Sequence, residues 1–203
     1  MTRYHGLGLA ALLLFPALLP TAGSQPVMPV RHEMVQRAPA IPVAHTDQAL
    51  LAMPDDMAVR EDDLTCLAQA VYFEARSEPL EGQIAVAQVV LNRVKSEYWP
   101  DSVCAVVFQN EHRRNGCQFS FACDGRSDRP YNMVAWDKAR KIARLALQSK
   151  LPDITEQATH YHADYVAPDW QNRLEETAIY GRHRFYRETE DTRRGHLLAR
   201  QQS

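Results

Sequence analysis

The chain lacks an excess of charge of either sign, because 23 Lys and Arg residues nearly balance 25 Asp and Glu residues over 203 positions. Such a balance gives no electrostatic reason to expect nucleic acid or an anionic membrane as a partner. The sequence has no internal repeat. Its apolar run at Gly6–Leu19 is shorter than the roughly 20 residues that a membrane-spanning helix needs. These absences leave a globular protein of ordinary composition as the expectation.

The apolar run has the flanks of a secretory leader. Met1–His5 carries a base and no acid, Pro20 ends the run, and the small residues 21–24 follow. Because this order is typical of a signal peptide, we expect residues 1–24 to be a leader cleaved after Gly23 or Ser24. An uncleaved N-terminal anchor is the alternative, and both export the rest of the chain. A periplasm is the preferred setting, since the sequence shows no sorting signal or wall-anchoring repeat, with secretion or anchoring as alternatives.

The remainder divides by composition. Residues 25–60 hold five prolines and scattered charge with no apolar period, which predicts a disordered linker. Residues 188–203 are polar and predict a disordered tail. One domain is therefore expected at residues 61–187, and we expect it to act as a monomer with no stable membrane insertion after leader cleavage.

Four cysteines fit an exported protein. An even count in an oxidising compartment suggests two disulfides, and the sequence allows three pairings. A small loop between Cys117 and Cys123 is sterically possible, and Cys66–Cys104 would then tie two helices together. The sequence has no CxxC pair, so a zinc site built on cysteine is not favoured.

Apolar periodicity predicts a mainly helical (α+β) domain. The first helix begins after residues 61–63, carries an apolar stripe and ends before Pro79. The second, from Leu80 to Lys95, is apolar almost all round and is expected in the centre of the domain, with its amides Gln88 and Asn92 bonded to a nearby loop. The other expected elements are helices at Ser102–Phe108 and Met133–Gln148, a loop at Asn110–Pro130, an extended segment at Thr159–Val166, and a terminal hairpin at Thr177–Tyr186.

The densest carboxylate group lies at the end of the first helix. Glu74 falls at the flank of the apolar stripe, where partial desolvation favours the protonated form. Glu78 lies one turn further on, and a second negative charge acts in the same direction, whereas Arg76 opposes it. A carboxyl kept protonated is what a glycosidase needs as its general acid. The alternative is a helix-end charge cluster on the surface.

A second candidate is the His-rich segment at residues 159–165. His160 and His162 share one face of a strand, and Asp164 or His183 would complete a zinc site of the kind used by an amidase. The favoured interpretation is instead the aromatic wall of a groove, with no metal and no organic cofactor.

Beyond these patterns, the run Leu67–Val94 (LAQAVYFEARSEPLEGQIAVAQVVLNRV) closely resembles the signature of the SleB-type cell-wall hydrolases. Three further stretches agree: Gln118–Phe121 (QFSF), Thr159–Ala163 (THYHA) with Pro168 and Trp170 after it, and Gly181–Tyr186 (GRHRFY). The resemblance covers about residues 64–187. One departure is Ser77, where many members have glycine, and it leaves the position of Glu78 less certain.

The resemblance implies a lysozyme or lytic-transglycosylase-like helical domain with a small β hairpin. It implies cleavage of peptidoglycan glycan strands at the bond between N-acetylmuramic acid and N-acetylglucosamine, with Glu74 as the general acid and base. Lytic transglycosylation needs this carboxylate alone, whereas hydrolysis would use Glu78 as well. The expected substrate-binding residues are Glu78, Gln118, Ser120, Tyr161 and His162. A non-catalytic peptidoglycan-binding module and a zinc-dependent amidase are the alternatives.

Overall fold

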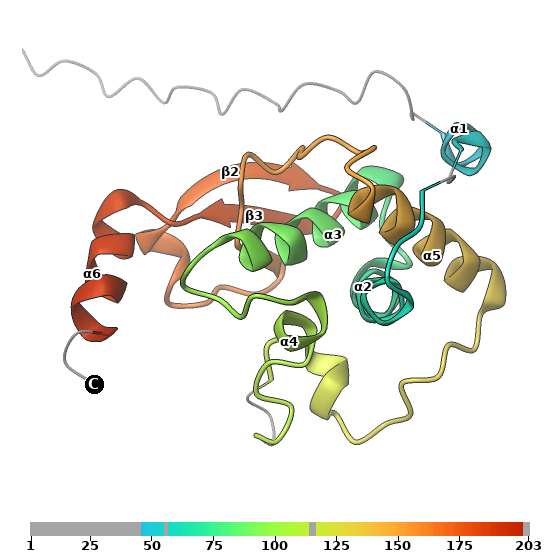
Figure 1. Cartoon of the computed structure of the whole chain (residues 1–203). Coiled ribbons are helices and arrows are strands. Elements are labelled where there is room, and N and C mark those ends of the chain that lie inside the picture. Colours follow the sequence, from blue (N-terminus) through green and yellow to red (C-terminus); the bar gives the residue numbers. More distant parts are fainter. Residues whose placement is uncertain (1–45, 55–56, 114–116, 201–203) are drawn as a thin grey trace, which may run out of the picture. The chain divides into compact units, whose positions relative to one another are not determined.

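The computed structural model describes residues 46–54, 57–113 and 117–200, with the backbone alone at 196–200 (Figure 1). Its helices and strands follow this order: α1 Asp47–Ala52, α2 Glu61–Ala75, α3 Leu80–Lys95, α4 Val103–Val107, the 3-10 turn η1 Ser120–Cys123, α5 Met133–Leu147, β1 His160–Ala163, the 3-10 turn η2 Gln171–Arg173, β2 Glu175–Tyr180, β3 His183–Arg187 and α6 Glu190–Arg200.

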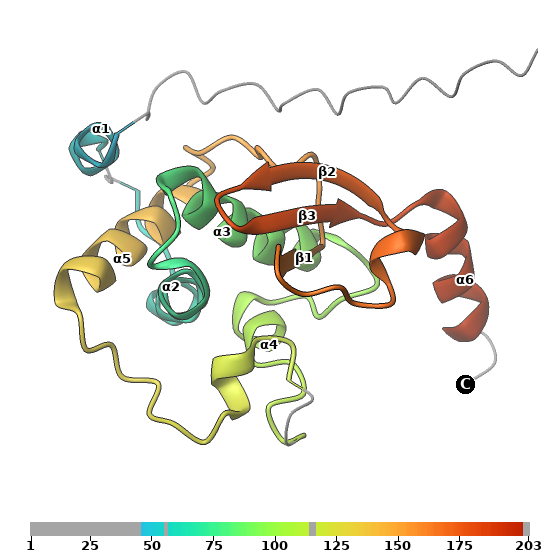
Figure 2. The ribbon, with the colours of Figure 1, turned by 180° about the vertical axis from the view of Figure 1, so that it is seen from behind.

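Three helices form the core. The helix α2 packs against both α3 and α5, and α3 runs between α2 and the sheet (Figures 1 and 2). Because α3 has neighbours on all sides, nearly all of its side chains are buried, as its apolar sequence predicts. The fully buried side chains of this core include Leu64, Leu67 and Val71 of α2, Ile84 and Val86 of α3, and Ile142 and Leu145 of α5.

The ends of these helices follow from local chemistry. Pro79 is the N-cap of α3, which separates it from α2, and Glu81 lies in the first turn of α3, where a negative charge is favoured. The side chain of Asn132 caps α5 by accepting from Ala135 N at 3.1 Å. The predicted helices at 80–95 and 133–148 are thus confirmed.

The sheet is antiparallel, with strand order β1-β3-β2. The expected hairpin is present as β2 and β3, which Gly181 joins at a φ of +56°. The extended segment after Thr159 adds β1 on the other side of β3, with Tyr161 opposite Phe185. The amides of α3 hold the loop before β1, because Gln88 Nε2 donates to Leu151 O at 3.1 Å and Asn92 Nδ2 to Ala158 O at 3.1 Å. This is the loop-bonding role predicted for them.

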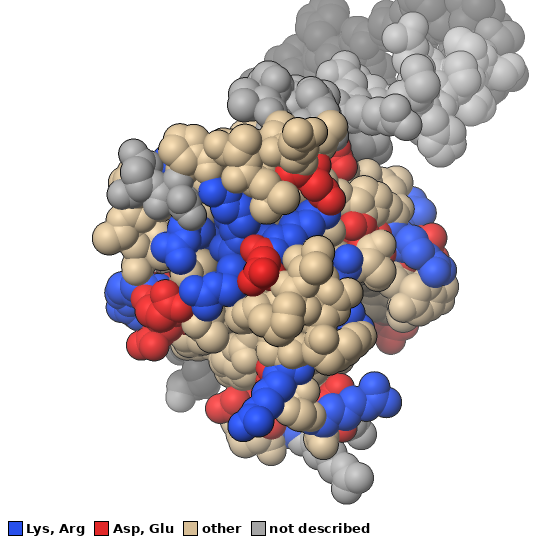
Figure 3. All heavy atoms as spheres, turned by 90° about the vertical axis from the view of Figure 1, so that its right-hand side faces the viewer, with Lys and Arg blue, Asp and Glu red and all other residues tan. Residues whose placement is uncertain are grey.

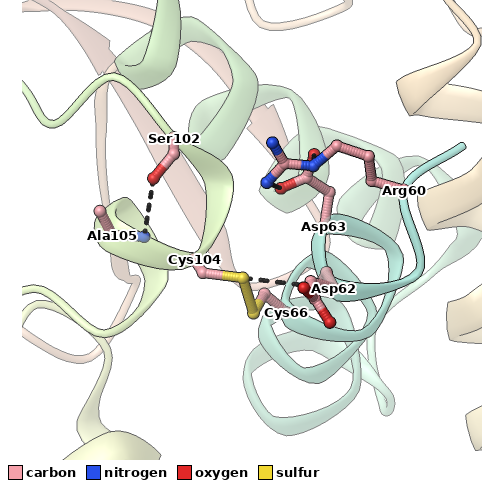
Figure 4. Close-up of a disulfide and its surroundings, with 7 residues drawn as sticks. All are labelled: Arg60, Asp62, Asp63, Cys66, Ser102, Cys104 and Ala105. Atoms are coloured by element: carbon pink, nitrogen blue, oxygen red, sulfur yellow. Dashed lines mark hydrogen bonds and ion pairs between the residues drawn. A yellow bond between two sulfur atoms is a disulfide. The ribbon is translucent and has the colours of Figure 1, made fainter.

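Two disulfides link the four cysteines, in the pairing that the sequence left as one of three. Cys66 of α2 is bonded to Cys104 of α4, where Cys104 Sγ also lies 3.4 Å from Asp62 O (Figure 4). Cys117 is bonded to Cys123 and closes a small loop around η1. The first bond connects the core helix α2 to α4, and the second restrains the loop that carries Ser120.

The expected linker contains a helix, which corrects that prediction. Leu50 of α1 is fully buried in the core, Lys138 of α5 pairs with Asp47 at 2.6 Å, and Lys141 Nζ donates to Met53 O at 2.5 Å. Lys and Arg side chains gather on the side of the domain that lies to the right in Figure 1, where α5 lies (Figure 3). One buried leucine and several basic side chains therefore order a segment that composition alone assigns to disorder.

The expected tail also contains a helix, α6. Thr189 Oγ1 accepts from Thr192 N at 3.3 Å in its first turn, and Thr192 Oγ1 donates to Arg173 O at 3.3 Å. The proposed leader and residues 25–45 of the linker lie outside the described residues. Within the described part of the chain, no helix is both long and apolar enough to cross a membrane.

Candidate active site

Glu74 occupies the last turn of α2, directly before the helix ends at Ala75. Its side chain is half-buried, as its place at the flank of the apolar stripe predicts. The hydroxyl of Ser120 donates to its Oε1 at 3.5 Å, and the hydroxyl of Tyr161 donates to its Oε2 at 3.2 Å. One carboxylate from α2 thus meets one hydroxyl from η1 and one from β1.

Burial raises the pKa of Glu74 above its ordinary value of 4.5. Hydrogen bonds from Tyr161 and from Ser120, together with the positive charge of Arg93, oppose this rise without cancelling it. Burial and the neighbouring Glu74 carboxylate raise the pKa of Tyr161 well above 10, so its hydroxyl keeps its proton. The site therefore favours a protonated carboxyl and supplies donors for the ionised form that follows proton transfer.

Arg93 joins the elements that carry these groups, although sequence reasoning did not select it. It is fully buried in the last turn of α3, and its Nε donates to Thr159 O at 2.7 Å, directly before β1. With the Gln118 amide turned so that its oxygen faces Arg93, that oxygen accepts from both terminal nitrogens at 3.2 Å. The guanidinium lies 4.3 Å from the ring centre of Trp99 and 5.4 Å from that of Phe119.

Burial lowers the pKa of Arg93 to about 10, which leaves it cationic at neutral pH. The sequence could have indicated Arg93, because an arginine in a helix that is apolar almost all round has to be buried with polar partners. Gln118, expected to bind substrate, is placed beside Arg93 in this arrangement.

Glu78 does not join Glu74, Ser120 and Tyr161. Its Oε2 accepts from Arg182 N at 2.9 Å, in the turn between β2 and β3. The turn comes so close that a Cβ atom added at Gly181 would lie 2.0 Å from this oxygen. Glu78, in the short link between α2 and α3, thus caps a backbone turn that is distant in sequence, and no local sequence pattern reveals this contact.

His162 does not face Glu74 either, because successive side chains of a strand point to opposite faces of the sheet. Its Nδ1 lies 2.9 Å from Ala163 O, and its Nε2 lies 2.9 Å from the hydroxyl of Tyr186. That hydroxyl also lies 3.0 Å from Glu176 Oε2, and Glu176 is paired with Arg184 at 2.8 Å. Tyr161 and His162 were expected on one wall of a groove; the pleat of β1 separates them.

The residues expected for the alternative zinc site do not come together in the structure. His160 and His162 do share a face, but His183 lies on the face of Tyr161 and Phe185, and Asp164 is paired with Arg182 at 3.3 Å. No group of three or more His, Cys, Asp and Glu side chains within the described ranges is arranged to hold a metal ion.

The fold is thus a helical core with a small antiparallel sheet, and a half-buried glutamate lies where the two meet. The sequence profile of the cell wall hydrolase family matches residues 77–186, and the chain belongs to this family. The match includes Gln118, Ser120 and Tyr161 and begins three residues after Glu74.

Among curated relatives, the spore cortex-lytic enzyme of Halalkalibacterium halodurans is 34% identical over 126 residues, which are 62% of this chain and 34% of that protein. The spore cortex-lytic enzyme of Bacillus subtilis is 56% identical over 48 residues, 24% of this chain and 16% of that protein. The matches thus span about a third or less of the length of these relatives.

Two solved structures share the fold. The catalytic domain of the Bacillus cereus SleB protein is 30% identical with a TM-score of 0.53, covering 64% of this chain and 93% of that one. The catalytic domain of the germination-specific lytic transglycosylase SleB from Bacillus anthracis is 30% identical with a TM-score of 0.50, covering 66% and 100%. The prediction of a mainly helical domain with a small β element of this type is confirmed.

Proposed function

We propose that this protein cuts the glycan strands of peptidoglycan at the bond between N-acetylmuramic acid and N-acetylglucosamine, with Glu74 as the proton donor. One observation carries the proposal: a half-buried carboxyl with a raised pKa lies between the hydroxyls of Ser120 and Tyr161. Such a carboxyl is available as a general acid at a pH where an exposed glutamate is ionised. Membership of the cell wall hydrolase family supports the choice of substrate.

In the first step Glu74 gives its proton to the glycosidic oxygen, and positive charge develops at the anomeric carbon of the muramic acid. The carboxylate that remains is stabilised by the two hydroxyl donors and by the positive charge of Arg93. These groups are fixed before the reaction, since Arg93 is bonded to Thr159 O next to β1 and to the loop of Gln118. The stabilisation therefore needs little rearrangement when the charge appears.

In the second step the 6-hydroxyl of the muramic acid attacks the anomeric carbon, and the ionised Glu74 accepts the proton of that hydroxyl. The product is a 1,6-anhydro sugar. This route needs a single carboxylate, and the engagement of Glu78 with Arg182 N supports it over hydrolysis with a second carboxylate. The description of the Bacillus anthracis domain as a lytic transglycosylase points the same way.

The role of the other expected residues follows from their contacts. Ser120 is exposed beside Glu74, which suits it to an N-acetyl or hydroxyl group of the substrate. Tyr161 orients the carboxyl of Glu74, and Gln118 acts through Arg93. Glu78 and His162 hold the sheet and its turn and are not assigned to substrate.

The decisive experiment compares Glu74→Gln with Glu81→Gln on purified sacculi, followed by mass spectrometry of the released muropeptides. Glu81 is a matched control because it lies in the first turn of α3, close in sequence and outside the site. We expect Glu74→Gln to lose roughly a thousandfold or more in rate and Glu81→Gln to match the wild type. Lysis that is unchanged in Glu74→Gln would remove the proposal.

The released products separate the remaining possibilities. Anhydromuramic ends indicate transglycosylation, reducing ends indicate hydrolysis, and freed stem peptides indicate an amidase. Binding to sacculi without any release indicates a binding module. Activity that survives prolonged EDTA treatment excludes a zinc amidase.

We further propose that the protein is exported through residues 1–24 and acts as a monomer in the periplasm. Mass spectrometry of the mature N-terminus tests the cleavage after Gly23 or Ser24.

A further inference from the structure

His183 is a buried imidazole beside the Glu74 site that the mechanism above does not use. It begins β3 directly after the turn at residues 181–182, and 8% of its surface remains exposed. Its ring centre lies 5.1 Å from that of Tyr161, the residue that donates to Glu74. Both side chains lie on the face of the sheet that is turned toward α2 and α3, since Tyr161 pairs with Phe185, two positions after His183.

The hydrogen bonds of this ring are incomplete. Nδ1 is enclosed and has no partner among the described residues. Nε2 has no described partner either, yet it is absent from the fully enclosed atoms, so the exposed edge of the ring is on its side. His162, on the other face of the same sheet, has neighbours at 2.9 Å for both nitrogens. Since buried polar atoms are nearly always bonded, the exception at His183 requires a reason.

The groups around His183 determine the protonation state of its imidazole. Burial lowers the pKa of His183, while the carboxylates of Glu78 and Asp164 oppose this and His162 adds to it. The ring is therefore neutral at neutral pH and carries one N–H. Because an enclosed N–H without an acceptor is rarer than an unused acceptor, the proton belongs on Nε2, the nitrogen that can reach a ligand.

We propose that His183 is a substrate-contacting residue whose Nε2–H donates a hydrogen bond to an uncharged oxygen, a hydroxyl or an N-acetyl carbonyl, of the saccharide bound at Glu74. This inference rests on the proposed function. The strand holds this neutral donor at a fixed position, so it favours a sugar that has an oxygen at that position. A sugar without that oxygen leaves the Nε2–H unpaired and loses the hydrogen bond.

The test uses three variants of the full chain. His183→Gln keeps an amide donor near the position of Nε2, His183→Asn places it near Nδ1, and His183→Phe keeps the ring without a donor. We expect His183→Gln to stay within about fivefold of the wild type in kcat/KM on purified glycan strands, and His183→Asn and His183→Phe to lose roughly 10- to 100-fold. Thermal unfolding of each variant, measured in parallel, identifies losses that come from folding. His160→Gln, on the opposite face of the sheet, is the control and is expected to be unchanged.

The outcomes separate this inference from the proposed function. If Glu74→Gln is inactive while His183→Phe keeps full activity, the role of His183 is overturned and that of Glu74 stands. If Glu74→Gln keeps full activity, both fall. A uniform loss in all three variants, including His183→Gln, would also overturn the donor role.

A measurement on the unaltered protein does not depend on the variants folding. The ¹⁵N spectrum of the imidazole is expected to show the Nε2–H tautomer of His183 at neutral pH, with a shift of that nitrogen when soluble glycan fragments bind. An Nδ1–H tautomer, or no response to the fragments, contradicts the proposal.

Discussion

The hydroxyl of Tyr161 donates to Glu74 Oε2 at 3.2 Å, across 87 residues of sequence. This bond favours the ionised carboxylate and so lowers a pKa that burial raises. The contact joins the C-terminal turn of α2 to the outer strand β1. A side chain of the sheet therefore lowers the pKa of a residue in a helix, and the positive charge of Arg93 acts in the same direction. Because burial raises the pKa of Glu74 and the Tyr161 hydrogen bond lowers it, removing the hydroxyl should shift this pKa in a defined direction.

Tyr161→Phe is expected to move the alkaline limb of the activity profile to higher pH. Without the hydroxyl donor the pKa of Glu74 rises further, and the protonated form that acts as the acid persists to higher pH. The maximal rate is expected to fall by roughly tenfold, because the carboxylate formed after proton transfer loses a donor. The measurement is the rate of muropeptide release between pH 4 and 9.

Tyr180→Phe is the matched control, because that hydroxyl donates to Ile154 O at 2.9 Å rather than to Glu74. Its alkaline limb should coincide with that of the wild type. An alkaline limb of Tyr161→Phe that stays in place or moves to lower pH would contradict the proposed coupling.

Glu74→Gln is expected to make the folded protein more stable at neutral pH. The folded state raises the pKa of Glu74, so it binds the proton more tightly than the unfolded state does, and stability is lost as the pH rises from about 4.5 through the raised value. A neutral amide has no such cost. The difference in melting temperature between variant and wild type should be small at low pH and should favour the variant increasingly as the pH rises; a difference that does not depend on pH would argue against the burial of this charge.

The sequence could predict those elements of the fold that depend on local residue patterns. The apolar stripes and Pro79 locate α2 and α3, and the place of Glu74 at the edge of its stripe anticipates partial burial. Arg93 was missed because its hydrogen-bond partners, Gln118 and Thr159, lie 25 or more residues away in the sequence.

Glu78 was expected near substrate as a second carboxylate one turn after Glu74, and His162 as part of a groove wall together with Tyr161. Their actual direction depends on a turn made by residues 181–182 and on the pleat of a strand, which only tertiary pairing determines. The helix α1 was missed because it has six residues and one buried leucine, although Thr46 does accept from Ala49 N at 3.2 Å as a cap.

Gly181→Ala is expected to destabilise the protein by about 1–3 kcal/mol. The added Cβ would lie 2.7 Å from Pro79 Cδ and 2.0 Å from Glu78 Oε2, at a φ of +56°. Gly125→Ala separates the two causes, because Gly125 also has a positive φ, +75°, with nothing within 4 Å of the added atom. Urea unfolding should show the smaller loss for Gly125→Ala; equal losses would mean that backbone strain alone is responsible and that the turn is not packed on Glu78.

The two disulfides are expected to differ in what they support. Removing Cys66–Cys104, which closes 38 positions, should cost about 4 kcal/mol by chain entropy, and removing Cys117–Cys123, which closes 6, about 2 kcal/mol. The second loop carries Ser120, so the Cys117→Ala/Cys123→Ala variant should lose more activity relative to its loss of stability than the Cys66→Ala/Cys104→Ala variant does. Unfolding curves and rates measured below both midpoints check this, and the opposite order of activity losses would show that the small loop does not position Ser120.

Leu50→Ala tests whether α1 belongs to the folded unit. Leu50 is fully buried and Leu51, its neighbour in the same helix, is 55% exposed, so the pair forms its own control. Removing the buried side chain should cost about 2–4 kcal/mol, whereas Leu51→Ala should remain within about 0.5 kcal/mol of the wild type. The asymmetry follows from the packing of α1 on α5, which the Lys138–Asp47 pair and the Lys141–Met53 bond reinforce at the surface without supplying apolar burial. If both variants unfold at the same denaturant concentration as the wild type, α1 does not dock on α5, and the folded domain begins at α2.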